Sequence, residues 1–376
     1  MLVAGLFAGI GGFELGFERA GHRTILLCES DEFASKVLRR RWPGVRLHGD
    51  VATLEDLPKE TDVVSAGFPC QNLSMAGDKK GLKGRKSTIV DKLFGLLDRR
   101  DVPWVVIENV YFMLHLGRGS AVEHILNQLE RRGYRWAYRV VDSRGFGLAQ
   151  RRRRVFIVAS QSFDPRSVLL AGDAGAREWP VVDMASPIGF YWTEGRTGHG
   201  LTADAIPPLK AGSTLGIPSP PAVLLPSGRV VTPPIEAVER LQGFPKGWTS
   251  VLRNKAARRH RWRLVGNAVS VPVSEWIGGQ LTNPGHYDGR QDAPLDPNGS
   301  WPNAAWNMDG VREGRRTASG LTEHPVKRRR GTVSAFATEH WPSLSDRALR
   351  GFARRAREGR LTYPAGFLDA LEANLP

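Results

Sequence analysis

The sequence has 376 residues, of which 53 are Lys or Arg and 38 are Asp or Glu, so its formal net charge is +15. A surplus of this size favours a polyanionic partner, and nucleic acid is the leading candidate. The sequence contains no run of about eighteen apolar residues, so no membrane association is predicted. Its two cysteines exclude a disulfide framework and favour a reducing, cytoplasmic location.

Apolar β-like runs alternate with helical patterns as far as about residue 160. Strands are predicted over residues 2–6, 24–28, 62–66, 104–107, 136–141 and 155–159. The first strand is followed by a glycine-rich loop and a helix that ends at Gly21, and a second helix follows residues 24–28. This alternation predicts an α/β fold with a doubly wound, mostly parallel sheet whose two faces are covered by helices.

The amino-acid composition changes after residue 160. Residues 161–231 are rich in Pro, Gly, Ser and Thr, which predicts a small, loop-rich insert. Helices are predicted over residues 234–241 and near 270–278, and residues 283–310 have the composition of a linker or an irregular cover. Residues 311–376 contain 13 Lys or Arg and 7 Asp or Glu, with one helix predicted over 345–357. The default interpretation of residues 283–376 is a structural cap on the core.

The glycine loop after the first strand has the sequence Gly9-Ile10-Gly11-Gly12. A strand, a glycine turn and a helix bind many nucleotides, but the dinucleotide spacing fails here because Glu14 stands where the third glycine would be. Glu29 lies at the tip of the next strand, where a carboxylate can accept hydrogen bonds from ribose hydroxyls. Asp50, in His48-Gly49-Asp50-Val51, ends the strand that follows Glu29 and can bind an adenine amino group. The pattern predicts an adenosine-bearing cofactor.

Two short motifs follow apolar strands further along the chain. They are Gly67-Phe68-Pro69-Cys70-Gln71 and Glu108-Asn109-Val110. The first supplies a thiol and the second a carboxyl, and both are expected at the carboxyl edge of the sheet, where open α/β sheets bind ligands. These are the two groups needed to add a nucleophile across a cytosine ring. Cys28, by contrast, ends an apolar strand and is predicted to be a small core residue.

Six motifs in order resemble the signature of DNA cytosine-5 methyltransferases. Any one of them can arise by chance, whereas the ordered set is specific. The resemblance covers residues 2–159 and roughly 229–280. The motifs are Leu6-Phe7-Ala8-Gly9-Ile10-Gly11-Gly12-Phe13, Gly67-Phe68-Pro69-Cys70-Gln71, Glu108-Asn109-Val110, Gln150-Arg151-Arg152-Arg153-Arg154, Arg240-Leu241-Gln242-Gly243-Phe244-Pro245 and Gly266-Asn267-Ala268-Val269.

The resemblance implies a Rossmann-like class I methyltransferase and a role for each catalytic residue. Cys70, as a thiolate, is expected to add to carbon 6 of cytosine, so that carbon 5 becomes nucleophilic. Glu108 is expected to hydrogen-bond or protonate ring nitrogen 3. Arg154 is expected to bind the ring carbonyl oxygen, and Arg152 and Gln150 to organise the wall of the site.

The resemblance also identifies the cofactor as S-adenosyl-L-methionine. The glycine loop is expected to hold it, with an aromatic ring near the adenine, a carboxylate at the ribose, and a late motif folding back beside the first strand. The implied cofactor-binding residues are Phe7, Ala8, Gly9, Ile10, Gly11, Gly12, Glu29, Ser30, Asp50, Val51, Pro69, Ile89, Asn267 and Val269.

A basic segment after Cys70 is expected to close over DNA when the target cytosine leaves the stack. The alternative is a solvated basic loop. The predicted DNA-binding residues are Gln71, Ser74, Lys79, Lys80, Arg85 and Lys86. A second arginine-rich region fits either a solvated face or a DNA footprint, and it comprises Arg131, Arg132, Arg135, Arg139 and Arg144. The nine histidines show no metal-ligand spacing, so no metal site is predicted.

The resemblance divides the chain into four parts. Residues 1–160 and 232–282 are expected to form the catalytic domain, residues 161–231 the target recognition region, and residues 283–376 a basic, aromatic-rich extension of unknown role. Pro234 stands where the family pattern usually has an arginine. The predicted protein is a monomer that methylates double-stranded DNA, with restriction or defence proteins as candidate cognate partners.

Two alternatives remain at this stage. A tRNA cytosine-5 methyltransferase shares the motifs but lacks a sizeable DNA-recognition insert, and the roughly 70 residues between 160 and 231 argue against it. A catalytically silent DNA-binding relative usually loses one of the motif residues, and Cys70, Glu108, Arg154 and Asn267 are all present.

Overall fold

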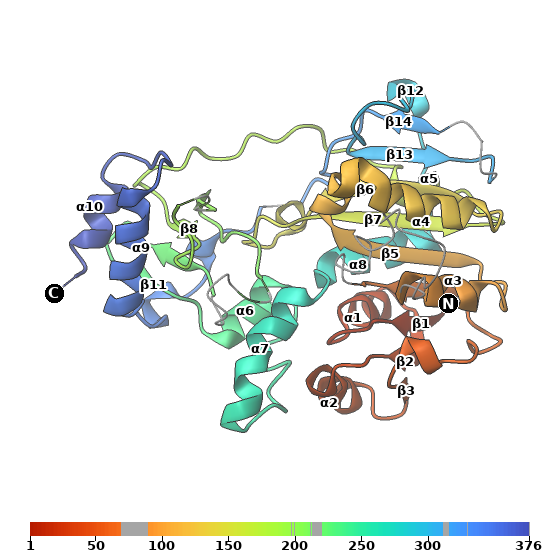
Figure 1. The fold of residues 1–376 in the computed structure, drawn as a ribbon, viewed down its shortest axis with the longest axis horizontal. Helices are drawn as coiled ribbons and strands as arrows, with labels where there is room; N and C mark the ends of the chain where they lie inside the picture. The colour runs from red at the N-terminus through yellow and green to blue at the C-terminus, as the bar shows by residue number, and fades with distance from the viewer. Residues whose placement is uncertain are drawn as a thin grey trace, which may run out of the picture. The chain divides into compact units, whose positions relative to one another are not determined.

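The computed structural model describes residues 1–68, 89–196, 198, 200–210, 212, 220–310, 316–328 and 330–375, with only the backbone described at 255 and 256. The chain forms two compact units, each built from three segments (Figure 1). Unit 1 comprises Met1–Asp142, Arg153–Ala176 and Val269–Lys327. Unit 2 comprises Ser143–Arg152, Arg177–Ala268 and Arg328–Pro376. The C-terminal extension is therefore divided between the two units.

Unit 1 is built on one large sheet. Its strand order is β12-β14-β13-β6-β7-β5-β4-β1-β2-β3. The strands β1 to β5 are parallel, whereas β7 runs antiparallel to both of its neighbours, β5 and β6. The order reverses between β1 and β4, which is the position where open α/β sheets bind ligands. The bounds are β1 (Leu2–Leu6), β2 (Arg23–Cys28), β3 (Arg46–His48), β4 (Val63–Ala66), β5 (Trp104–Val110), β6 (Arg135–Asp142), β7 (Arg153–Ser160), β12 (Asp292–Pro294), β13 (Ala304–Asn307) and β14 (Thr317–Ser319).

Helices cover both faces of this sheet, which confirms the predicted doubly wound, mostly parallel fold. On one face, α3 and α4 bury alternate apolar residues of the strands in the main core. On the other face, α1 packs against the sheet and against α8, and two glycines of α1 allow the backbones to approach closely. The bounds are α1 (Gly12–Arg19), α2 (Glu32–Arg41), α3 (Ile89–Leu97), α4 (Ser120–Glu130), α5 (Arg166–Leu169) and α8 (Val271–Thr282). Short 3-10 helices in this unit are η1 (Val51–Thr53), η4 (Tyr111–Leu114), η5 (Leu116–Gly119) and η7 (Gly289–Gln291).

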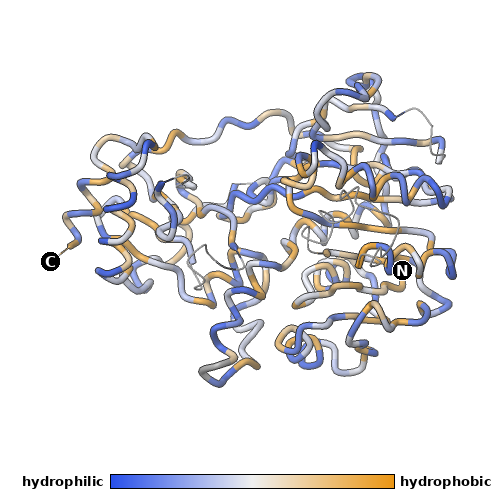
Figure 2. Tube along the Cα trace, viewed as in Figure 1, coloured by the Kyte–Doolittle hydropathy of each residue, from blue (hydrophilic) through white to orange (hydrophobic). Residues whose placement is uncertain are grey.

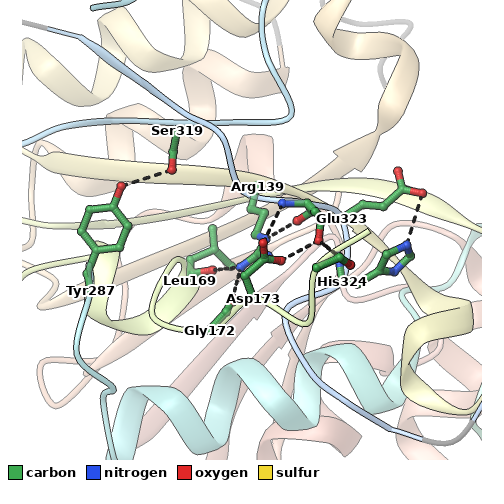
Figure 3. A network of polar contacts seen from close by, with 10 residues as sticks. Arg139, Leu169, Gly172, Asp173, Tyr287, Ser319, Glu323 and His324 are labelled. Carbon is green, nitrogen blue, oxygen red and sulfur yellow. Dashed lines mark hydrogen bonds and ion pairs between the residues drawn. The ribbon is translucent and has the colours of Figure 1, made fainter. Parts of the chain in front are cut away.

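Part of the C-terminal extension continues the large sheet, because β13 pairs antiparallel with β6. A buried arginine on β6 ties this added part to the core (Figure 3). Arg139 Nε donates to Thr322 O at 2.8 Å, its Nη1 donates to Gly172 O at 2.5 Å, and its Nη2 lies 2.8 Å from Asp173 Oδ1. Burial lowers the pKa of Arg139 to about 10, and the Asp173 carboxylate opposes that shift.

Five arginines between residues 131 and 144 were predicted to lie either on a solvated face or in a DNA footprint, and two of them are instead inside the protein. Arg139 and Arg144 are fully buried. Arg144 belongs to unit 2, where its Nη2 donates to Ala203 O at 2.6 Å and its guanidinium lies over the Trp179 ring. A buried guanidinium needs such partners, because an unpaired buried charge is costly.

Unit 2 contains a four-stranded antiparallel sheet in the order β11-β10-β8-β9. The helix predicted over 345–357 is confirmed as α9, which packs on this sheet with Phe352 against Phe190 at 4.9 Å between ring centroids. Pro234 is the N-cap residue of α6. The bounds are β8 (Ile188–Phe190), β9 (Thr202–Ala203), β10 (Ala222–Leu224), β11 (Val230–Val231), α6 (Ile235–Leu241), α7 (Lys255–Asn267), α9 (Asp346–Glu358), α10 (Phe367–Glu372), η6 (Ser143–Phe146), η8 (Val333–Ala335) and η9 (Thr338–His340).

The distribution of hydrophobic residues explains which helices and strands the sequence predicts. Figure 2 shows hydrophobic colours along the central strands of the large sheet and hydrophilic colours along much of α7. The helix α7 was not predicted, because its first two turns are dominated by basic residues and show no clear apolar face. Within the described part of the chain, no helix is both long and apolar enough to cross a membrane.

Candidate active site and cofactor pocket

The glycine loop leaves β1 through a tight turn. Gly9 and Gly11 have φ values of 58° and 86°, in the left-handed region that glycine adopts without a Cβ clash. Gly11 N donates to Ala8 O at 2.8 Å, and Gly11 is the N-cap residue of α1. Ala8 N donates to Cys28 O at 3.1 Å, which joins the loop to β2. Backbone hydrogen bonds therefore hold the loop at the carboxyl ends of β1 and β2.

Gly12 is held against the chain that returns before α8. A Cβ at Gly12 would lie 2.6 Å from Val269 O, and Ser274 Oγ donates to Gly12 O at 2.8 Å. Only a residue without a side chain allows this approach. The structure thus brings the first glycine motif and Val269 together, as the sequence predicted for a late motif that returns beside the first strand.

Glu29 stands at the end of β2 beside the glycine loop. Its two carboxylate oxygens accept hydrogen bonds from Gly9 N and Asp31 N, each at 2.7 Å. Burial raises the pKa of Glu29, and these two hydrogen bonds act in the opposite direction. Each oxygen retains a lone pair, so the carboxylate can also accept hydrogen bonds from the hydroxyls of a bound nucleoside.

The other described residues of the predicted cofactor pocket differ in their exposure to solvent. Ser30 and Asp50 are exposed, and Asp50 accepts a hydrogen bond from Ala52 N at 2.8 Å. Ile10 and Val51 are buried. Phe7 and Ile89 are partly buried against the main core.

A carboxylate and a guanidinium meet where β5 and β7 lie side by side. Glu108 Oε1 lies 3.1 Å from Arg154 Nε, and the two side chains are 9% and 15% exposed. The register that pairs Val110 with Arg154 places both groups at the same end of the sheet. The side chain of Arg154 also donates from Nη1 to Arg153 O at 2.8 Å. The pair is therefore oriented by strand pairing rather than by a flexible loop.

Asn109 connects this pair to the end of β4. Its buried Nδ2 donates to Phe68 O at 3.0 Å. The Phe68 ring meets the Phe7 ring edge-on at 5.9 Å between centroids. A Cβ at Gly67 would lie 3.7 Å from Glu108 Oε2. The chain that leads into Cys70 is thus held beside Glu108 and the glycine loop up to residue 68.

Several predicted site residues lie outside the described residues. These are Pro69, Cys70, Gln71, Ser74, Lys79, Lys80, Arg85 and Lys86.

Gln150 and Arg152, predicted to organise the wall of the site, are buried in unit 2 and bound to its backbone. Arg152 donates to Leu209 O at 3.1 Å, to Gly266 O at 3.1 Å and to Ala268 O at 2.9 Å. The last two carbonyls flank Asn267, which is exposed at the end of α7. Gln150 Nε2 donates to Leu241 O at 3.0 Å, and its Oε1 accepts from Leu209 N at 2.9 Å.

Sequence reasoning assigned no role to two residues that organise unit 2. Gln242 Nε2 donates to Ala268 O at 2.5 Å and its Oε1 accepts from Gln150 Nε2 at 2.6 Å. Glu239 is fully buried and accepts hydrogen bonds from Gly247 N at 2.6 Å and Thr249 N at 2.8 Å, beside Arg261. The only signal was their position in or next to the Arg-Leu-Gln-Gly-Phe-Pro motif.

Glu14, the residue at the position of a third glycine, is buried between α1 and the sheet. Its Oε1 accepts a hydrogen bond from Ser65 Oγ at 3.4 Å and occupies the space that a Cβ at Gly5 would need. Burial raises its pKa to about 8. Cys28 is buried in the main core, which confirms it as a small core residue, and burial raises the pKa of its thiol to about 12.

Comparisons with known proteins converge on one family. A family model described as C-5 cytosine-specific DNA methylase matches residues 1–173. The chain is 42% identical over 385 residues to the type II methyltransferase M2.BsuMI of Bacillus subtilis, covering 99% of this chain and 97% of the relative. It is 29% identical to the type II methyltransferase M.NlaX of Neisseria lactamica, covering 73% of this chain and 94% of that relative.

A solved structure shares the fold. The Dnmt2 methyltransferase of S. pombe aligns with a TM-score of 0.53 at 15% sequence identity, covering 75% of this chain and 99% of that one. At this identity the match concerns the fold alone.

Proposed function

The chain belongs to the C-5 cytosine-specific DNA methylase family, and on that premise we propose that it methylates carbon 5 of a cytosine swung out of a specific duplex DNA sequence. The Glu108–Arg154 pair beside the glycine loop is the observation that carries the proposal. A carboxyl and a guanidinium held together at the carboxyl end of the sheet match ring nitrogen 3 and the carbonyl oxygen of cytosine. The likeness to type II methyltransferases supports a place in a restriction-modification or defence system.

S-adenosylmethionine is the proposed methyl donor, and when bound it supplies an electrophilic methyl group. The residues beside the glycine loop fit the nucleoside part of S-adenosylmethionine. Glu29 offers acceptors for ribose hydroxyls, Asp50 and Val51 lie beyond β3 where the adenine is expected, and a Cβ at Gly9 would meet no heavy atom within 4 Å. Phe7 offers an aromatic ring beside the loop. Asn267 and Val269 are proposed to complete the pocket from the returning segment.

The proposed chemistry begins at Cys70. Its thiolate adds to carbon 6 of the cytosine, and Glu108 donates or shares a proton at nitrogen 3 so that the ring becomes a neutral enamine. Carbon 5 then takes the methyl group, which leaves the donor as a neutral thioether, and Glu108 takes back the proton from nitrogen 3. Loss of the carbon 5 proton to a base restores the double bond and expels Cys70 as a thiolate. The enzyme is back in its starting state once that base has released its proton to solvent.

Arg154 is proposed to bind the ring carbonyl oxygen while its Nε orients Glu108. A guanidinium has five N–H groups in a fixed plane, so it can serve both partners at once. Gln150 and Arg152 are proposed as positioning residues, since their polar groups hold the backbone on both sides of Asn267 and at Leu209. We further propose that the protein acts as a monomer and that it acts in the cytoplasm, and the scarcity of cysteine supports the proposed location.

The test uses purified protein, labelled S-adenosylmethionine and unmethylated genomic DNA, followed by bisulfite sequencing, with tRNA in a parallel reaction. Protected cytosines in one short recurring DNA context are the expected result. Label in tRNA alone would show that tRNA rather than DNA is the substrate. Label in neither nucleic acid would favour a catalytically silent relative.

A further inference from the structure

Unit 2 has a groove of about 780 Å³ on the solvent side of α9, in the C-terminal extension. Arginines and one tryptophan dominate its lining. The residues that matter here are Trp192, Arg347, Arg350, Gly351, Arg354 and Arg355. The helix α9, which carries the arginines of the groove, lies beyond the last motif of the family signature.

The sequence of α9 separates an apolar face from a basic one. Leu349, Phe352, Ala353 and Ala356 are buried, and Phe352 packs on Phe190 of β8. Arg347, Arg350 and Arg354 are exposed, and their spacing of three and four residues places them along one face of a helix. We call these three residues the basic stripe.

The floor and wall of the groove are rigid. Gly351 lies between the stripe arginines, and a Cβ there would come within 3.2 Å of Arg355 Nη1. Arg355 donates from Nε to Glu194 O at 2.9 Å and from Nη2 to Trp192 O at 2.8 Å. The Trp192 indole donates to Pro220 O at 2.8 Å. The basic stripe therefore lies on a helix that is held against the four-stranded sheet of unit 2 and the loop after β8.

The charge of this face is positive. The helix α9 carries five arginines and two acidic residues, Asp346 and Glu358. One arginine, Arg357, is engaged with Asp369 and Glu372 of α10. Glu358 lies at the far end of the stripe, 3.9 Å from Arg354 Nε, and also pairs with Arg196. The arginines of α9 therefore outnumber its acidic residues, which gives the helix a surplus of positive charge.

We propose that the basic stripe binds the sugar-phosphate backbone of duplex DNA outside the base pair that is methylated, an inference that rests on the proposed function. Arginine forks match phosphate oxygens in charge and geometry. From Arg347 to Arg354 the helix rises by about 10 Å, which spans about three phosphates of one strand at 3.4 Å of rise each. An acidic protein partner is disfavoured because the groove offers one tryptophan and no cluster of apolar anchors.

The test compares two charge-matched variants of the full chain. R347Q/R350Q/R354Q removes the stripe, and K36Q/R39Q/R40Q removes three exposed cations from α2 in unit 1. Binding of each protein to a labelled 40-base-pair duplex is measured between 50 and 300 mM salt. Each lost phosphate contact lowers the slope of log K against log salt by about 0.9. The stripe variant should therefore lose up to about 2.7 units of slope, and the α2 variant should keep the wild-type slope.

A third variant, R347K/R350K/R354K, should keep most of the slope, because lysine retains the positive charge. An unchanged slope of log K against log salt in R347Q/R350Q/R354Q would overturn the proposal. An equal loss of slope in the α2 variant would also overturn it, because the effect would then come from net charge. Binding is the readout, so the outcome does not depend on methylation. A wild-type protein that binds through the stripe but methylates no DNA would defeat the proposed function and leave the stripe supported.

Discussion

Arg154 Nε lies 3.1 Å from Glu108 Oε1 across the antiparallel pair β5 and β7, and both side chains are largely removed from solvent. This contact depends on the one strand that runs against the others in the centre of the sheet. Because β7 enters from the opposite direction, its first residues reach the carboxyl end of β5. A parallel β7 would deliver Arg154 to the other edge.

Replacing Glu108 with glutamine should slow methylation without preventing DNA binding. The amide keeps the size of the carboxyl but cannot donate an acidic proton to ring nitrogen 3. We expect kcat to fall by about 10² to 10⁴, with DNA affinity close to that of the wild type. Single-turnover methylation and a DNA titration check this. Glu60→Gln, an exposed glutamate, is the matched control, and equal activity in Glu108→Gln would remove Glu108 from the acid role.

Replacing Arg154 with glutamine should destabilise the protein as well as inactivate it. The change leaves the Glu108 carboxylate without its guanidinium in a site that is mostly buried. We expect a loss of about 2 kcal/mol in the free energy of unfolding. Arg151→Gln alters an exposed neighbour and should cost less than about 0.5 kcal/mol. Urea unfolding of both variants measures the difference, and similar losses would contradict a structural role for the pair.

Cys70→Ala should abolish turnover and leave S-adenosylmethionine binding nearly intact. Cys28→Ala should remain active, because Cys28 is buried in the core and its thiol pKa is raised to about 12. Thiol labelling of the native protein should accordingly modify Cys70 and spare Cys28. Methylation by the Cys70→Ala protein would defeat the covalent mechanism.

Glu14 should make the protein less stable as the pH rises. Burial raises its pKa from 4.5 to about 8, so between these values the folded state keeps a proton that the unfolded chain has released. Its stabilising contribution is complete below pH 4.5 and is lost as the pH rises from 4.5 to 8, and the loss between pH 5 and pH 9 amounts to about 4 kcal/mol. Urea unfolding at pH 5 and pH 9 measures it. Glu14→Gln should flatten this dependence, whereas Glu60→Gln should leave it unchanged.

Gly12→Ala should weaken S-adenosylmethionine binding, because the added Cβ would lie 2.6 Å from the backbone oxygen of Val269 and push the returning segment away. Gly21→Ala is the control. Its φ of 89° makes an alanine cost about 1 to 2 kcal/mol, but a Cβ there would meet no heavy atom within 4 Å. Calorimetric titration with S-adenosylmethionine should show reduced affinity for the first variant only. Equal affinities would contradict the role of this contact in the pocket.

Local patterns explain why so much of unit 1 was predictable. The strands β1, β2, β4 and β5 contain short apolar runs, and such runs are recognised from residues that are close together in the sequence. The extended sheet was not predicted, because β12, β13 and β14 are short and their pairing partners lie far away in the chain. The helix α7 was hidden by its basic residues, although Asn254 caps it and Arg261 is buried within it.

The sequence by itself determined the fold class, the family and the order of the motifs, because each of these depends on residues that are close together in the chain. Only the tertiary structure decided what each arginine does. Arg139, Arg144 and Arg152 bind backbone carbonyls inside the protein, Arg154 pairs with Glu108, and Arg347 lies exposed on α9. All carry the same guanidinium, and the carbonyls, carboxylates or solvent around it come from segments that meet only when the chain folds.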